Sequence, residues 1–222
     1  MRKYLSFIIC GVLCLSVAET ETGQTIQAPI WVYLETVPGS YDAKTVPEKE
    51  PPIQELDSIA RLILSGMIYG WRFSYTPSDK TRQVEESFSL EPIGEITKGD
   101  TNYALKQIRP AYPRLSCWAQ YTIDEKAARW ESYWDSVLFT ASSGRGQGER
   151  TRETAGIRDA YTTAIQAAIR EYARKQIKNK PKELRGEVLL SDEPRLFVQS
   201  GYFIADVRIL INLQEIIPYR NF

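Results

Sequence analysis

The chain has 222 residues, and its 28 lysine and arginine residues balance 28 aspartate and glutamate residues, for a formal net charge of zero. This balance argues against a nucleic-acid partner, which usually requires a strongly basic surface. The sequence contains no histidine and only three cysteines, which excludes Ser-His-Asp and Cys-His catalytic sites and the common zinc sites. Only carboxylate, lysine, tyrosine or serine chemistry remains available to an enzyme.

The first eighteen residues have the layout of a secretory signal. Arg2 and Lys3 precede an almost uncharged apolar run over residues 5–17. This run is shorter than the about 20 residues that a membrane-spanning helix needs. Ala18 offers the small residue that precedes a cleavage site, so we expect cleavage after it. The mature chain should then be a soluble protein of the periplasm or the exterior, without a transmembrane segment.

A lipoprotein signal is the alternative for this segment, because it also joins an apolar run to a processing site. Cys10 and Cys14 follow Ile9 and Leu13, which are bulky where such a signal needs a small residue. The sequence therefore favours a cleaved, soluble product over a lipid-anchored one or an uncleaved anchor, which stay as alternatives. Removal of the signal would leave Cys117 alone, so no internal disulfide is expected, which suits a periplasm-like compartment.

After a flexible polar leader over residues 19–27, a first unit is predicted over residues 28–96. Residues 30–37 are rich in β-branched and aromatic side chains and predict a strand. Residues 53–65 carry apolar side chains at three- and four-residue steps and predict a helix that stops at Gly66. Period-two alternation from Met67 to Tyr75, and again over residues 84–90, predicts a hairpin.

A second unit is predicted over residues 103–217, beyond a boundary near residues 94–102. Its first half should contain a strand over residues 115–123 and a helix over residues 125–139 that turns into a strand. The glycine-rich residues 142–149 predict a flexible, solvated loop. They lack the glycine spacing of a phosphate-binding motif.

Two clear elements follow in this second unit. Residues 154–177, with a continuous apolar face, are the clearest predicted helix of the sequence, and residues 203–213 alternate as a strand. The whole order predicts an α+β fold in which amphipathic helices pack on antiparallel sheets, possibly as two similar units.

A basic cluster near the end of the long helix is the first candidate binding surface. It could contact an anionic partner, although cations at a helix C-terminus also complement the helix dipole. Its members are Arg170, Arg174, Lys175, Lys178, Lys180 and Lys182.

An aromatic cluster is the second candidate. Trp130, Tyr133 and Trp134 lie in the segment whose structure the sequence defines least, so they could be exposed and stack on a ligand. Cys117 alternates into an apolar face, where a thiol is usually inert. The sequence indicates no catalytic residue, no metal ligand and no cofactor.

The helix over residues 154–177 leads into a strand with the sequence Tyr-Phe-Ile-Ala-Asp-Val-Arg-Ile at residues 202–209. This succession, over residues 154–213, resembles the small helix-on-sheet modules of bacterial periplasmic flagellar-assembly and envelope lipoproteins. The resemblance implies a non-enzymatic part of an envelope assembly and carries over no functional residues. The chain differs from those lipoproteins in its signal, as described above.

The leading hypothesis is therefore an exported structural or interaction component of the cell envelope, whose partner is another envelope protein or a cell-wall polymer. A binding module for cell-wall glycan or another anionic ligand is one alternative. A carboxylate-dependent hydrolase is another, since paired carboxylates can work without histidine.

Overall fold

The computed structural model describes residues 24–35, 51–136 and 138–219. The predicted signal and its cleavage site lie outside these residues. None of the helices in the described ranges is long and apolar enough to cross a membrane.

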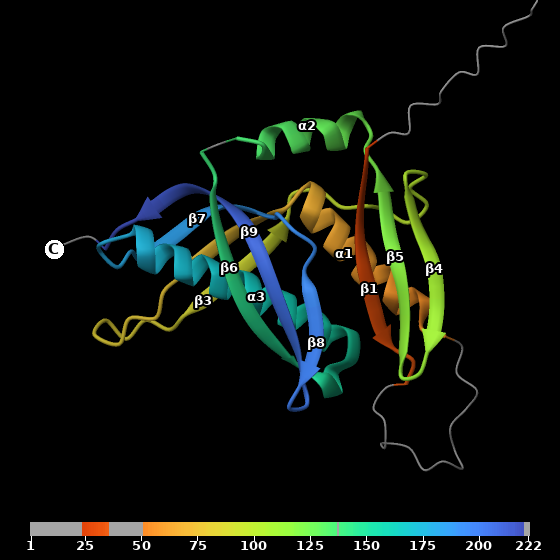
Figure 1. The fold of residues 1–222 in the computed structure, drawn as a ribbon. Coiled ribbons are helices and arrows are strands. Elements are labelled where there is room, and N and C mark those ends of the chain that lie inside the picture. The colour runs from red at the N-terminus through yellow and green to blue at the C-terminus, as the bar shows by residue number, and fades with distance from the viewer. Residues whose placement is uncertain (1–23, 36–50, 137, 220–222) are drawn as a thin grey trace, which may run out of the picture.

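The fold is α+β, as predicted, with two antiparallel sheets (Figure 1). The smaller sheet has the order β1-β5-β4, and the larger has the order β3-β2-β7-β9-β6 with β8 paired to β9. The strands are β1 (Thr25–Tyr33), β2 (Trp71–Thr76), β3 (Ser87–Pro92), β4 (Tyr103–Ala111), β5 (Arg114–Thr122), β6 (Thr140–Glu149), β7 (Glu183–Leu190), β8 (Arg195–Gln199) and β9 (Tyr202–Ile217). The helices are α1 (Ile53–Ile68), α2 (Glu125–Trp134) and α3 (Glu153–Gln176), with a short 3-10 turn over Arg150–Arg152.

Both sheets join strands from the two predicted units. β1 pairs with β5, and β2 pairs with β7, so each sheet crosses the boundary expected near residues 94–102. The two units do not form separate sheets, because strand pairing here connects segments that are far apart in sequence. The leader also ends earlier than predicted, since β1 already begins at Thr25.

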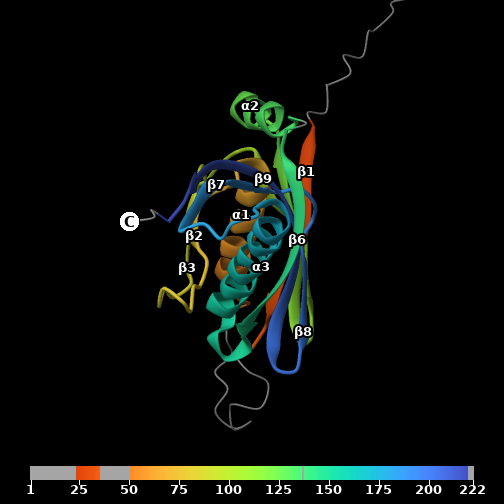
Figure 2. The ribbon, with the colours of Figure 1, turned by 90° about the vertical axis from the view of Figure 1, so that its left-hand side faces the viewer.

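The core lies around α1 and α3, which strands flank in both views (Figures 1 and 2). The inward stripe of α1 includes Leu56, Ile59 and Ile63, all fully buried. The stripe of α3 includes Ile157, Ile165 and Ile169 and packs on β6 and β9. The periodicity of both helices in the sequence therefore identified their buried faces.

Residues 142–149, predicted as a flexible loop, belong to strand β6, which pairs with β9 along its whole length. Gly144, Gly146 and Gly148 alternate toward α3, and a Cβ on Gly146 would lie 2.1 Å from the backbone nitrogen of Ala164. The helix presents small residues to this stripe, at Gly156, Ala160, Ala164 and Ala168, together with the hydroxyl of Thr163. The glycines thus let the helix backbone approach the strand closely, which a loop prediction based on composition misses.

The junction of α1 and β2 also differs from the prediction. The helix continues through Gly66 to Ile68, and the strand starts at Trp71 rather than at Met67. A Cβ on Gly66 would lie 1.8 Å from the Trp71 ring, so this glycine makes room for an indole instead of ending the helix. The turn falls at Gly70, whose φ of +76° is a conformation that favours glycine.

Candidate functional site

On the outer edge of β1, the main-chain groups of Gln27 and Trp31 have no hydrogen-bond partner among the described residues. Ile123 N donates to Gln24 O, and Leu34 N donates to Pro113 O, so the even-numbered residues of β1 face β5. Because main-chain groups alternate in direction along a strand, Gln27, Pro29 and Trp31 direct theirs away from the sheet. Pro29 lacks an N–H at a position where the ladder needs none, which is typical of an edge strand.

The outer edge of β8 can be assigned in the same way. The two-residue turn Ser200–Gly201, with φ values of 50° and 81°, connects β8 to β9 and makes Gln199 and Tyr202 a hydrogen-bonded pair. Leu196 and Val198 therefore direct their main-chain groups away from β9.

These two free edges face each other and touch at one point. The indole Nε1 of Trp31 donates a hydrogen bond of 3.2 Å to the carbonyl oxygen of Leu196. The centroid of the Trp31 ring lies 6.2 Å from that of the Phe203 ring. The guanidinium of Arg114, on β5, lies 3.9 Å from the centroid of the Trp31 ring. The side chain of Trp31 thus connects the two sheets at this point.

Beyond this contact, the edges border an open groove of about 940 Å³. One wall is β1 from Ile26 to Trp31, and the other is the segment from Ser191 to Phe197. A second hollow of about 550 Å³ continues the groove beneath α2, and the two share Ile26, Met67 and Ser191. Together they make one path between the sheets, which we call the edge groove.

The edge groove has an apolar floor and an acidic rim. The floor includes Met67, Leu189 and Leu210. The charged lining residues are Glu131, Asp135, Asp192, Glu193 and Arg195. Four acids against one base leave a negative rim, although Asp192 also lies 3.5 Å from Arg208. The Ser191 hydroxyl is buried and has no hydrogen-bond partner among the described residues.

The predicted basic cluster is divided by the structure. Arg170 is bound to Glu86, while Arg174 and Lys175 both pair with Glu171 on the same helix. Lys178, Lys180 and Lys182 follow α3, are exposed and have no ion pair within the described part of the chain. Half of the cluster is therefore occupied by intramolecular partners.

The predicted aromatic cluster does assemble, with Tyr133 5.5 Å from Trp130 and 5.2 Å from Trp134. Trp134, the last residue of α2, is only 3% exposed: its ring packs against Phe139 and its indole N–H donates to Tyr69 O, so it offers no open ring face. Tyr133 is 37% exposed, and its hydroxyl donates to Glu187 and accepts from Asn212. The hydrogen bonds hold this ring in place within the molecule.

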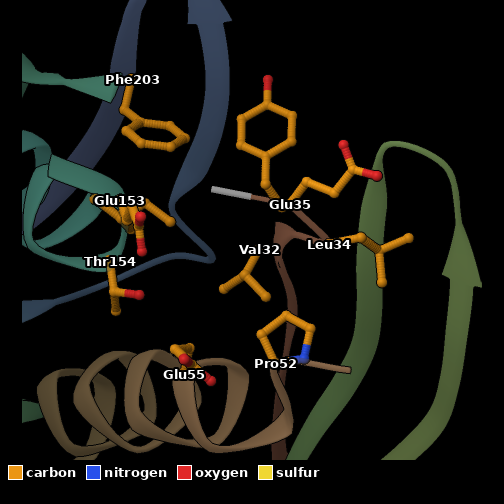
Figure 3. Close-up of a pocket in the computed structure, with 10 residues that line it drawn as sticks. Val32, Leu34, Glu35, Pro52, Glu55, Glu153, Thr154 and Phe203 are labelled. Atoms are coloured by element: carbon orange, nitrogen blue, oxygen red, sulfur yellow. The ribbon is translucent and has the colours of Figure 1, made fainter. Parts of the chain in front are cut away.

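Three glutamates, Glu35, Glu55 and Glu153, line a cavity where β1, α1 and α3 meet (Figure 3). Its volume is about 30 Å³. That is enough for a water molecule, which needs about 10–15 Å³, but not for a sugar ring. Across the described ranges, no group of three acidic or cysteine side chains is arranged to hold a metal ion.

The edge groove was not anticipated from the sequence. Its one local signal is Pro29, a proline inside a strand pattern, which marks an edge strand. The partner edge, β8, has no such signal, and only the tertiary pairing places it opposite β1.

Comparison with known proteins gives a family match across nearly the whole chain. A family model matches residues 13–219. An uncharacterized protein of Treponema pallidum (strain Nichols) is 38% identical over 195 residues, which cover 88% of this chain and 82% of the relative. No solved structure matches the chain. The resemblance to flagellar-assembly and envelope lipoproteins stays a prediction.

Proposed function

The chain belongs to the same family as the Treponema pallidum protein, and we propose that it is a non-enzymatic binding protein of the cell envelope. The opening of about 940 Å³ between the edges of β1 and β8 supports this proposal. The edge groove takes up an extended segment of another envelope protein by strand addition. The positive segment and apolar run of residues 2–17 support export to the periplasm or the exterior.

The observation that carries this proposal is the opposition of two unpaired edges. An added strand between β1 and β8 finds main-chain groups on both sides, at Gln27 and Trp31 on β1 and at the Leu196 N–H on β8, whose carbonyl oxygen already accepts from Trp31. Main-chain hydrogen bonds supply affinity in strand addition, and side-chain pockets supply specificity. The inserted segment would join the two sheets through one additional strand.

The lining of the groove defines the chemistry of the segment. The apolar floor at Met67 and Leu210 favours apolar side chains on one face of the added strand, at every second residue. The acidic rim favours lysine or arginine on the other face, since opposite charges steer association and select partners. The unpartnered hydroxyl of Ser191 offers one further hydrogen bond.

Site-specific photocrosslinking in the native organism tests this assignment. A photoreactive amino acid at Gln27 should crosslink one envelope protein through an extended basic and apolar segment, identified by mass spectrometry of the joined peptides. The matched control is Ser89, an exposed residue of β3, which is also an edge strand but faces no second edge. Equal products from both positions, or crosslinks to glycan alone, contradict the proposal.

A pair of substitutions then separates main-chain from side-chain recognition. For this comparison the photoreactive amino acid is moved to Glu193, an exposed residue on the opposite wall of the groove. Gln27→Pro removes an outward N–H that β5 does not use, so the sheet should persist while the crosslink from position 193 is lost. Gln27→Ala removes the same side chain, including its contact with Gln120, but keeps the N–H, and should leave the crosslink intact. If both variants reduce the crosslink equally, strand addition is wrong.

A further inference from the structure

A second opening, separate from the edge groove, lies between α1, α3 and the β2–β3 hairpin. Its volume is about 480 Å³, and no residue lines both this cavity and the edge groove. This volume is within the range of about 300–1,000 Å³ that small-molecule sites occupy. Two arginines, Arg61 from α1 and Arg158 from α3, line it.

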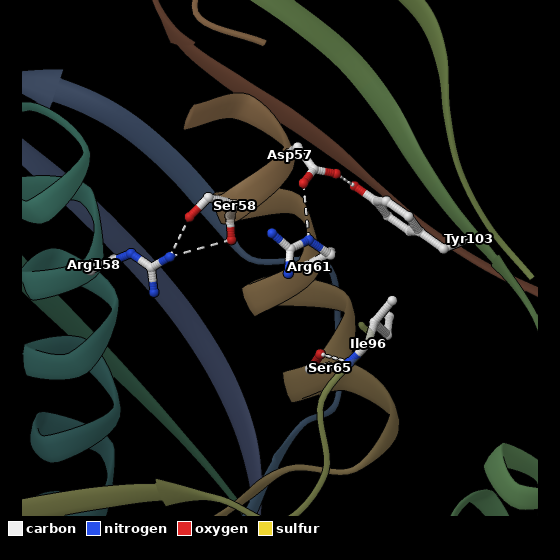
Figure 4. Close-up of polar contacts among 7 residues, drawn as sticks. All are labelled: Asp57, Ser58, Arg61, Ser65, Ile96, Tyr103 and Arg158. Carbon is white, nitrogen blue, oxygen red and sulfur yellow. Dashed lines mark hydrogen bonds and ion pairs between the residues drawn. The ribbon is translucent and has the colours of Figure 1, made fainter. Parts of the chain in front are cut away.

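The Arg61 side chain is held in place through its Nε, while its two Nη groups stay available for a ligand. Its side chain is 22% exposed, and its Nε donates a 3.0 Å hydrogen bond to Asp57, whose other oxygen accepts from the Tyr103 hydroxyl at 2.9 Å (Figure 4). The two Nη groups have no hydrogen-bond partner among the described residues, and neither is fully enclosed. A fixed guanidinium with free Nη donors suits bidentate binding of an oxyanion.

Arg158 reaches the same cavity from the opposite helix. It donates to the backbone carbonyl of Ser58 at 3.5 Å and to the Ser58 hydroxyl. No carboxylate pairs with it in the part of the chain that the structure describes. Figure 4 shows the guanidinium groups of Arg158 and Arg61 directed toward one another. Two like charges that face one cavity are stabilised by an anion placed between them.

The remaining walls restrict which anion fits. Trp71, Leu90 and Ile96 are apolar lining residues, and Thr162 also lines the cavity. Glu95 also lines the cavity and disfavours a second negative charge on the ligand. We propose that this cavity binds a small monocarboxylate with an apolar body, its carboxylate between Arg61 and Arg158 and its apolar part against Trp71.

Titration of the full chain with phenylacetate, followed by the NMR signal of the Trp71 indole, tests the site. We expect saturable binding with a Kd on the order of 1 mM, which is typical of a ligand of this size. Phenylacetamide has the same shape without the charge and should bind at least about tenfold more weakly. Inorganic phosphate should bind more weakly than phenylacetate. Equal binding of the amide, tighter binding of phosphate or no saturable shift overturns the proposal.

Two arginine variants locate the carboxylate. Arg158→Gln should raise the Kd for phenylacetate about tenfold or more, because it removes a charged donor from an exposed side chain. Arg61→Lys keeps a positive charge beside Asp57 but loses the planar pair of guanidinium donors that binds a carboxylate through two hydrogen bonds. It should therefore weaken binding similarly. Arg129→Gln, on α2 and outside the cavity, is the matched control and should leave the Kd unchanged. An unchanged Kd in Arg158→Gln, with the fold intact by circular dichroism, overturns the assignment.

Discussion

Arg170 Nε donates a 3.1 Å hydrogen bond to the carboxylate of Glu86, which ties α3 to the residue just before β3. The same carboxylate accepts a 2.7 Å hydrogen bond from the Tyr75 hydroxyl on β2. Three elements therefore meet at one carboxylate. An arginine that the sequence offers as part of a ligand-binding patch serves to position the hairpin against the helix.

The Glu86 carboxylate should make the free energy of unfolding depend on pH in the acid range. Burial raises the pKa of Glu86, but the hydrogen bonds from Tyr75 and Arg170 outweigh burial and hold the pKa below the ordinary value of 4.5. A lowered folded-state pKa stabilises the protein above pH 4.5, and this contribution is lost as pH falls through the folded-state pKa. We expect Glu86→Gln to lower the free energy of unfolding at pH 7 by about 0.5–1 kcal/mol, since the pair is partly exposed.

Urea unfolding of wild type and Glu86→Gln between pH 7 and pH 3 measures this contribution, and the difference should shrink below pH 4.5. Glu85→Gln is the matched control, because Glu85 is exposed and forms no ion pair within the described ranges. A Glu86 effect that is the same at both ends of the pH range would refute the ion-pair explanation.

The glycine stripe of β6 should tolerate no side chain. Gly146→Ala places a methyl group 2.1 Å from the Ala164 nitrogen, where backbone cannot yield, and should cost about 3 kcal/mol in unfolding free energy. Gln147→Ala changes the next residue, which is exposed, and should stay within about 0.5 kcal/mol of wild type. Thermal unfolding of both variants checks this, and similar stability of the two would contradict the close packing.

The contact between the two sheets should be measurable at Trp31. Trp31→Phe keeps an aromatic ring near Phe203 but removes the indole N–H that Leu196 O accepts, so we expect a loss of about 1 kcal/mol in urea unfolding. Trp118→Phe alters an indole that is 36% exposed on β5 and should cost less than about 0.5 kcal/mol. Equal losses would show that the Leu196 contact contributes nothing.

The Cys117 thiol should react slowly in the folded protein. Burial, and to a smaller degree the charge of Asp57, raises its pKa to about 11. At pH 8 the thiolate fraction is then about 0.1%, and the side chain is only 5% exposed. We expect a colorimetric thiol reagent to modify Cys117 promptly in urea but hardly at all in buffer. Rapid modification in buffer would contradict the buried position.

The elements with strong side-chain periodicity were predictable from the sequence. The alternation from Phe203 to Leu213 falls within β9, and the apolar stripe of residues 154–177 matches α3 within one or two residues. In both elements burial on one face determines which residues are apolar. The periodicity of apolar residues along the segment is therefore enough to predict the element.

The elements governed by close backbone contact were not predictable in the same way. In β6 the inward residues are glycines, which leave no hydrophobic alternation and look like a loop. The sequence also places small residues on one face of the helix, at Gly156, Ala160, Ala164 and Ala168. This pattern indicates close packing only when it is compared with the glycines of the strand. The edge groove depends on pairing between residues about 90 apart in β1 and β5, which local patterns do not encode.

The position of β9 in the chain has a consequence for the order of folding. Strands β6 and β8 pair with no strand other than β9 within the described chain, and β9 begins only at Tyr202. During synthesis, the apolar face of α3 must therefore wait for β9 before its sheet can close. Every other described element is therefore synthesised before this half of the molecule can acquire its cooperative structure.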